Sequence, residues 1–146
     1  MEKISVKKLN KNAILPTYGT EFSAGADLYA CTQEEIQITP GTARLIHTGL
    51  SMEIPEGFVG LVFARSGLAS RDGLAPSNKV GVIDSDYRGE IMVSLFNHLK
   101  KTRIVKPDDK IAQIVIVPFL KATWTETDTL SDTERGNGGF GSTDKN

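Results

Sequence analysis

The sequence Ile111-Ala112-Gln113-Ile114-Val115-Ile116-Val117 is apolar on both faces of an extended chain, except at Gln113. A strand with one exposed face alternates apolar and polar residues, whereas a strand that is apolar on both faces is covered on both. A small domain supplies cover on one face, and a partner subunit is the natural source of the other. We therefore expect a buried strand at residues 111–117 and an oligomer around it.

Gln113 is the polar exception within this run. A side-chain amide buried among apolar residues needs hydrogen-bond partners, or its burial costs about 1–3 kcal/mol. The residues alone leave two interpretations open. Gln113 either belongs to a polar site that satisfies its amide, or it lies at the solvent-exposed end of the strand.

Outside this run the chain is a series of short strand-like segments separated by turn residues, with no linker, no repeat and no long helical periodicity. Only residues 67–71 leave room for a helical turn. Many short strands at this spacing predict an all-β sandwich or barrel of antiparallel strands. The predicted strands lie at residues 4–7, 26–31, 36–38, 43–46, 50–54, 58–64, 80–83, 90–96, 103–105 and 111–117.

Composition is that of an ordinary domain: 146 residues, 24% of them charged, with a formal net charge of −1. This balance argues against a protein that wraps a polyanion, so any nucleic-acid partner is expected to be a nucleotide rather than a duplex. Cys31 is the single cysteine, so no intrachain disulfide forms and a reducing compartment is favoured. No run is long enough to span a membrane. We expect a cytoplasmic protein, or one in another reducing compartment reached by a signal outside this chain.

The segment Arg135-Gly136-Asn137-Gly138-Gly139-Phe140-Gly141-Ser142-Thr143 combines a cation, glycines, an aromatic ring and two hydroxyls. Glycines let backbone N–H groups surround an anion, the arginine and hydroxyls add donors, and the ring offers a face for a nucleobase. The alternative is a flexible Gly/Ser tail. The G-x-G-x-x-G spacing within it is not a dinucleotide fingerprint, because that motif must lie between a strand and a helix. No Walker motif occurs in the chain.

Three further segments place polar groups beside apolar strands. Residues 81–90 bring Asp84 and Asp86, a phenol and a guanidinium to a strand end, where a site or a solvated turn is equally expected. Asp27 is a charged residue within an otherwise apolar segment. It is either a site residue or lies at an edge or turn position. Arg65 and Ser66 follow the strand at 58–64 and suit anion binding, although a capped short helix explains Ser66 equally well.

In this order the segments resemble the trimeric dUTPase family, from about Val6 to Thr143. Three residues depart from the family pattern at the margins of its motifs: Asp108 replaces a usual Gly, Lys110 a usual Arg, and Asp144 a frequent Gly. The matching motifs are Ala24-Gly25-Ala26-Asp27-Leu28, Ala64-Arg65-Ser66-Gly67-Leu68-Ala69, residues 81–90, Asp109-Lys110-Ile111-Ala112-Gln113 and residues 135–143.

The resemblance implies a jelly-roll-like β fold assembled as a homotrimer, with each active site built from three subunits. Residues 1–130 would form the β domain, and residues 131–146 a Gly-rich arm that closes over the site. The implied reaction converts dUTP and water to dUMP and pyrophosphate with Mg²⁺ as cofactor. It keeps uracil out of DNA and supplies dUMP for thymidylate synthesis.

The resemblance also implies catalytic roles. Asp84 orients and deprotonates the water that attacks the α-phosphorus, and Asp27 holds waters of a Mg²⁺ ion whose direct ligands come from the triphosphate. Arg65, Ser66 and Gly67 grip the phosphates, with Ser66 near the leaving pyrophosphate. Gln113 hydrogen-bonds the network of phosphates and metal-bound waters.

Substrate selection is implied for two other regions. A tight hairpin at residues 78–81, with Asn78, Gly81 and Val82 in the binding set, reads the uracil edge and leaves no space for the 5-methyl of thymine. Tyr87 packs under the deoxyribose and excludes a 2′-hydroxyl. In the arm Phe140 stacks on uracil, and the residues that close over the γ-phosphate are Arg135, Gly141, Ser142 and Thr143.

Three alternatives differ in what they require of the sequence. A dCTP deaminase shares the implied fold but lacks an arm of this kind. A non-catalytic regulatory module would have lost Asp84, which is present. A structural β-sandwich needs none of the polar motifs. His47 and His98 offer no paired metal site, and we interpret both as surface or core residues.

Overall fold

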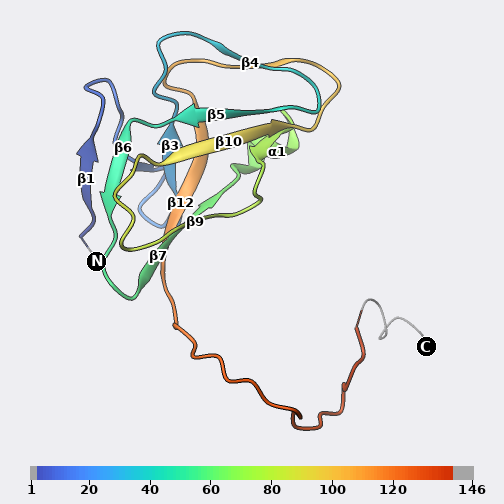
Figure 1. Cartoon of the computed structure of the whole chain (residues 1–146). Helices are drawn as coiled ribbons and strands as arrows, with labels where there is room; N and C mark the ends of the chain where they lie inside the picture. Colours follow the sequence, from blue (N-terminus) through green and yellow to red (C-terminus); the bar gives the residue numbers. More distant parts are fainter. Residues whose placement is uncertain (1–2, 140–146) are drawn as a thin grey trace.

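The computed structural model describes residues 3–139. Strands dominate it, and the helix α1 (Ser66–Ser70) is a single short turn (Figure 1). The strands are β1 (Ser5–Lys8), β2 (Thr17–Tyr18), β3 (Ala26–Tyr29), β4 (Ile36–Ile38), β5 (Ala43–His47), β6 (Leu50–Glu53), β7 (Phe58–Phe63), β8 (Leu74–Pro76), β9 (Gly81–Ile83), β10 (Met92–Asn97), β11 (Arg103–Val105) and β12 (Lys110–Pro118). The predicted all-β, jelly-roll-like class is confirmed.

Strand β12 is the centre of the largest sheet, whose order is β2-β3-β12-β7-β9. Its two neighbours are antiparallel to it, as Gln113 pairs with Asp27 on β3 and with Phe63 on β7. The predicted double cover holds at the start of the strand, where Ile111 and Ala112 are both buried. Towards its end Val115 and Val117 are only half-buried in the single chain.

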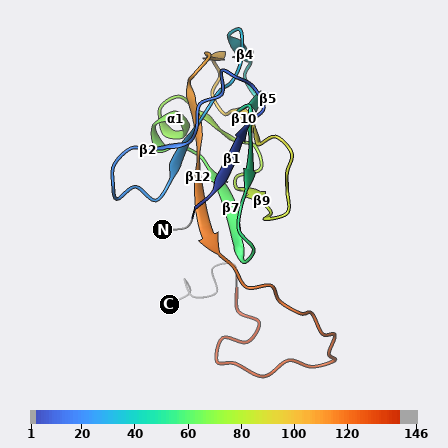
Figure 2. The ribbon, with the colours of Figure 1, turned by 90° about the vertical axis from the view of Figure 1, so that its left-hand side faces the viewer.

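A second sheet, in the order β5-β10-β8, and the two-stranded pairs β1-β6 and β11-β4 complete the domain. Figures 1 and 2 show β5 and β10 alongside the sheet that contains β12. One apolar core joins these sheets: Ile46 and Leu95 come from the second sheet, and Leu28 and Ile114 come from the first. Burial of such side chains, at about 1.5–3 kcal/mol each, holds the domain together.

Three details differ from the sequence-based expectations. Two short strands, β2 and β8, were not predicted. The segment at 78–81, predicted as a tight hairpin, is not one, because β8 pairs with β10 whereas β9 pairs with β7. It is a turn between two sheets, and Lys79 at its centre has a φ of 67°.

The chain after β12 leaves the domain. Figures 1 and 2 show it running away from the sheets, and no strand or helix is assigned within 119–139. Trp124 is 91% exposed in the single chain. No helix within residues 3–139 has the length and apolar character to cross a membrane.

Candidate functional site

A cleft of about 630 Å³ brings together five of the residues predicted for the site. They come from β3, from the corner between β7 and α1, and from β12. These elements are adjacent in space although they lie far apart in the sequence. The five residues are Asp27, Arg65, Ser66, Gly67 and Gln113.

The register of the largest sheet explains this convergence. Asp27 and Gln113 are directly paired across β3 and β12, so their side chains share one face of the sheet. The Gln113 amide donates to the Ala64 carbonyl at 2.9 Å, which satisfies one of its hydrogens. A Cβ at Gly25 would overlap with the Gln113 carbonyl oxygen, so glycine is required there for Gln113 to take this position.

Asp27 lies between two cations. Its Oδ1 accepts from Nε of Arg65 at 2.7 Å, and its Oδ2 lies 2.8 Å from Nζ of Lys110. A register shift between Lys110 and Ala112 makes the second contact possible. In a regular strand Lys110 and Gln113 would point to opposite faces, whereas the bulge pairs Lys110 with Tyr29, on the Asp27 face.

These contacts keep Asp27 ionised. Burial alone would raise the pKa of its carboxyl, but the hydrogen bonds from Lys110 and Arg65 outweigh burial and hold the pKa below the ordinary 3.8. The same pairing raises the pKa of Lys110. Asp27 is therefore a fixed carboxylate flanked by two fixed cations, and the same cleft also carries the ion pair of Arg71 with Asp72.

The corner that carries Arg65, Ser66 and Gly67 is open towards the cleft. Arg65 occupies the N-cap of α1 without a side-chain cap bond, and Ser66 is the first helical residue. Capping therefore does not explain Ser66. A Cβ at Gly67 would meet no atom within 4 Å, so packing does not explain this glycine either. Both residues are available to a ligand.

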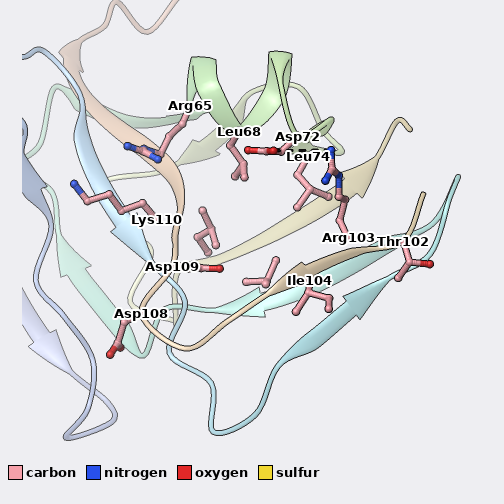
Figure 3. A pocket seen from close by; sticks show the side chains of 12 residues that line it. Arg65, Leu68, Asp72, Leu74, Thr102, Arg103, Ile104, Asp108, Asp109 and Lys110 are labelled. Atoms are coloured by element: carbon pink, nitrogen blue, oxygen red, sulfur yellow. Dashed lines mark ion pairs between the residues drawn. The ribbon is translucent and has the colours of Figure 1, made fainter. Parts of the chain in front are cut away.

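A second cleft of about 660 Å³ shares Arg65 with the first and is also lined by Lys110, the second cation that contacts Asp27. Figure 3 shows its apolar floor, with Leu68 and Ile104, and shows the charged ends of Arg65 and Lys110 directed to the same side. Those charged ends meet at Asp27, which lines the first cleft. Three carboxylates and three cations line the second cleft, and Asp72 lines both clefts.

The other half of the predicted site lies elsewhere in the chain. Asn78, Gly81, Val82 and Asp84 belong to the turn before β9, to β9 itself and to its end. None of them lines the first cleft. The loop that follows, residues 84–90, carries Tyr87, whose side chain is partly exposed. One chain thus holds two separate groups of site residues, which we call the cleft group and the loop group.

The predicted arm is described only in part. Nε of Arg135 donates to the Gly138 carbonyl at 2.9 Å, and Gly136 has a φ of 50°, so this stretch forms a turn. Phe140, Gly141, Ser142 and Thr143 lie outside the described residues. Their predicted contacts with base and phosphate stay predictions.

An apolar band continues from the cleft along the same face of the sheet. Val115 and Val117 on β12 pair with Leu61 and Val59 on β7, so their side chains share the face of Gln113. Val82 extends the band from β9 and is 61% exposed. Such a band next to a polar cleft is typical of a protein interface.

The sequence did not identify two charged residues as important. Lys110 appeared only as a departure from the family pattern, and no local signal reveals the bulge that turns it towards Asp27. Glu90 binds the backbone N–H of Gly49 and the ring of His47, 41 and 43 residues away. Contacts at such a separation leave no trace in sequence spacing.

No group of three or more His, Cys, Asp or Glu side chains within residues 3–139 is arranged to hold a metal ion. Cys31 is half-buried, and burial raises the pKa of its thiol. This is the environment of an inert thiol rather than a nucleophile.

A family model described as dUTPase matches residues 11–144. The deoxyuridine 5′-triphosphate nucleotidohydrolase of Nautilia profundicola is 48% identical over 143 residues, covering 98% of this chain and 99% of the relative. The dUTPase of Staphylococcus bacteriophage 80alpha, solved with dUPNHPP, aligns with a TM-score of 0.84 at 29% identity, over 97% of this chain and 98% of that one. A mutant dUTPase of phage phi11 of S. aureus, described with a structural Mg(II) ion, aligns with a TM-score of 0.79 at 25% identity, over 88% and 98%.

Proposed function

This chain belongs to the dUTPase family and is a dUTP nucleotidohydrolase, and from this premise we propose how its residues divide the reaction. It converts dUTP and water to dUMP and pyrophosphate. The observation that carries this proposal is the cleft group, in which Asp27, Arg65, Ser66, Gly67 and Gln113 line one cavity.

The cleft group binds the triphosphate. A triphosphate carries roughly four negative charges, which repel a water nucleophile unless fixed dipoles and cations offset them. Asp27 fixes Nε of Arg65, so the terminal nitrogens of the guanidinium point to phosphate oxygens. The Ser66 hydroxyl donates to the leaving pyrophosphate, and the space above Gly67 admits it.

A Mg²⁺ ion bound with the triphosphate would supply charge neutralisation. Asp27 fits an outer-sphere role, because it is ionised and each oxygen keeps a lone pair after accepting one hydrogen bond. Its side chain remains 13% exposed, which gives metal-bound water access to it. Gln113 contacts the same network from the neighbouring strand.

The loop group activates water and selects the nucleoside. Asp84, at the end of β9, accepts the proton of the water that attacks the α-phosphorus. Asn78, Gly81 and Val82 bind the uracil edge, and Tyr87 packs against the sugar. The arm, residues 131–146, brings Phe140 onto the base and Arg135, Gly141, Ser142 and Thr143 over the γ-phosphate.

The enzyme is a homotrimer with shared active sites. The apolar band borders the cleft group on the same face of the sheet, so a subunit docked on the band lies beside the cleft. Its loop group then completes the site that one chain leaves incomplete. The exposed side chains of residues 119–130, Trp124 among them, gain cover in the same assembly.

A nucleotide panel tests this function. With Mg²⁺ present, the protein should release pyrophosphate from dUTP and discriminate strongly against dTTP, dCTP and UTP. Ammonia released from dCTP would identify a deaminase, and orthophosphate released from dUTP would contradict attack at the α-phosphorus. Binding of dUTP without turnover would favour the regulatory module.

A further inference from the structure

Glu90 is the last residue of the loop at 84–90, and its side chain has no part in the proposed reaction. Its Oε1 accepts the backbone N–H of Gly49 at 2.8 Å, and its Oε2 lies 2.9 Å from Nδ1 of His47. The carboxylate thus grips both ends of the turn between β5 and β6. Hydrogen bonds to an ionised group are stronger than those between neutral groups.

The backbone on either side of Glu90 is tied to the same turn. The buried Thr48 hydroxyl donates to the Ile91 carbonyl at 2.6 Å, and the Ser51 hydroxyl donates to the Arg88 carbonyl at 2.8 Å. The N–H of Ile91 donates to the Leu50 carbonyl. Residues 88–91 are therefore fixed to the turn between β5 and β6 and to the start of β6.

The side chain of Tyr87 contacts this fixed segment. Its hydroxyl donates to the Glu90 carbonyl at 2.9 Å. A Cβ at Gly89 would overlap with the Tyr87 hydroxyl and ring, so the ring folds directly over the glycine. The direction in which the Tyr87 ring faces the solvent is thus set by Gly89 below it and by the Glu90 backbone at its tip.

We propose that Glu90 is a positioning residue that sets the discrimination between deoxyribose and ribose substrates by holding Tyr87 in place. Its side chain anchors the loop to the turn at residues 47–49, and its carbonyl holds the phenol. This inference rests on the proposed function, in which Tyr87 packs against the sugar. A ring that can retreat leaves room for a 2′-hydroxyl, whereas a ring that is held does not.

The test is the ratio of kcat/KM for dUTP to kcat/KM for UTP. Glu90→Ala removes both anchors and should lower this ratio about tenfold, the range expected for lost hydrogen bonds to a charged group. Glu90→Gln should keep most of it, because the amide oxygen still accepts from Gly49. Gly89→Ala should lower it at least as much as Glu90→Ala, because the methyl displaces the ring.

Glu53→Ala is the matched control. Glu53 also faces this loop: it pairs with Arg88 at 3.6 Å, and Arg88 donates to the Tyr87 backbone carbonyl at 3.0 Å. Because Glu53 is exposed and reaches the Tyr87 backbone only through Arg88, the ratio should not change. If Glu90→Ala fails to fold, His47→Ala removes only the exposed partner of Oε2 and should give a smaller fall. A general loss of stability would lower both kcat/KM values and leave their ratio unchanged.

Tyr87→Ala separates this inference from its premise. It should lower the ratio by itself, and adding Glu90→Ala to it should lower the ratio no further. An unchanged ratio in Tyr87→Ala would overturn the sugar contact and, with it, our inference. A fall in Tyr87→Ala with none in Glu90→Ala or His47→Ala would overturn the role of Glu90 alone.

Discussion

The cleft group and the loop group are built in opposite ways. In the cleft group, side chains pair with one another: Asp27 binds Arg65 and Lys110, and the Gln113 amide binds the backbone beside Arg65. In the loop group, the segment after Asp84 is held by hydrogen bonds to the turn between β5 and β6 and to the start of β6. The cleft group lines a charged cleft formed by the largest sheet and α1. The loop group lies on β9 of that sheet, on the turn before it and on the connection from β9 to β10 of the second sheet.

Under the proposed function, this difference separates phosphate binding from water activation and nucleoside selection. Paired charges suit a fixed polyanion, because their orientation is settled before the ligand arrives. An anchored loop suits selection, because small movements of its ring change what fits. We expect changes in the two groups to affect different kinetic constants.

The largest expected effect is on Asp84 in the loop group. Asp84→Asn should lower kcat by about 10²–10⁴-fold, the usual contribution of general base catalysis, while dUTP binding stays near the parental value. Single-turnover kinetics and equilibrium binding measure the two separately. Turnover close to that of the parent would place the base elsewhere and abolish the division between the two groups.

The arm is expected to cover the cleft group and the loop group at once, so changes in it test both groups together. Phe140→Ala should weaken binding by about 1–3 kcal/mol through lost stacking, whereas Phe140→Trp should retain most activity. Titration with a non-hydrolysable dUTP analogue measures this. A chain ending before Arg135 should still fold and trimerise but hydrolyse dUTP slowly; unchanged turnover would make the arm a passive tail.

Gly67 tests whether the open corner of the cleft group is kept for the ligand. Gly67→Ala should stabilise the fold by about 0.5–1 kcal/mol, because the helix gains alanine and the methyl meets open space. The same methyl should raise KM for dUTP. Thermal unfolding and steady-state kinetics on one sample measure both. Higher stability with an unchanged KM would show that phosphate does not approach this residue.

The smallest effect is expected at Lys110. The lowered pKa of Asp27 means that its pairing stabilises the folded state above pH 3.8, the ordinary value, and that this stabilisation is lost as the pH falls through the lowered pKa. Lys110→Met raises the pKa of Asp27, so acid unfolding should begin at a higher pH. Lys110→Arg keeps the cation and should behave like the parent. Coincident acid transitions in Lys110→Met and the parent would contradict the role of this pair.

The fold was predictable from the sequence where strands are apolar and bounded by turn residues. β7 and β12 were found close to their observed limits. β2 has only two residues and β8 ends in proline, so neither carries a pattern that differs from a loop. The turn at 77–80 resembled a hairpin because sequence does not reveal which sheet each flanking strand joins.

The candidate site was predictable where the residue type itself carries the chemistry. The structure brings Asp27, Arg65 and Gln113 together, and the family motifs singled out all three. Asp108 is instructive: it has a φ of 64° in the turn before β12, a conformation that glycine adopts without strain. The departure from the family pattern at Asp108 therefore affects the backbone conformation of this turn, which could not be predicted from the residue type alone.

The apolar band beside the cleft has a consequence for mixtures of defective chains. If each catalytic centre takes its anion grip from one protomer and its water activator from another, a protomer lacking Arg65 and a protomer lacking Asp84 are both inactive alone. Reassembled together, they form some centres in which both contributions are intact. Co-refolding of the two chains should therefore recover turnover, and dilution below the concentration at which protomers dissociate should abolish it. The recovered activity then depends on the ratio of the two chains rather than on any property of a single folded chain.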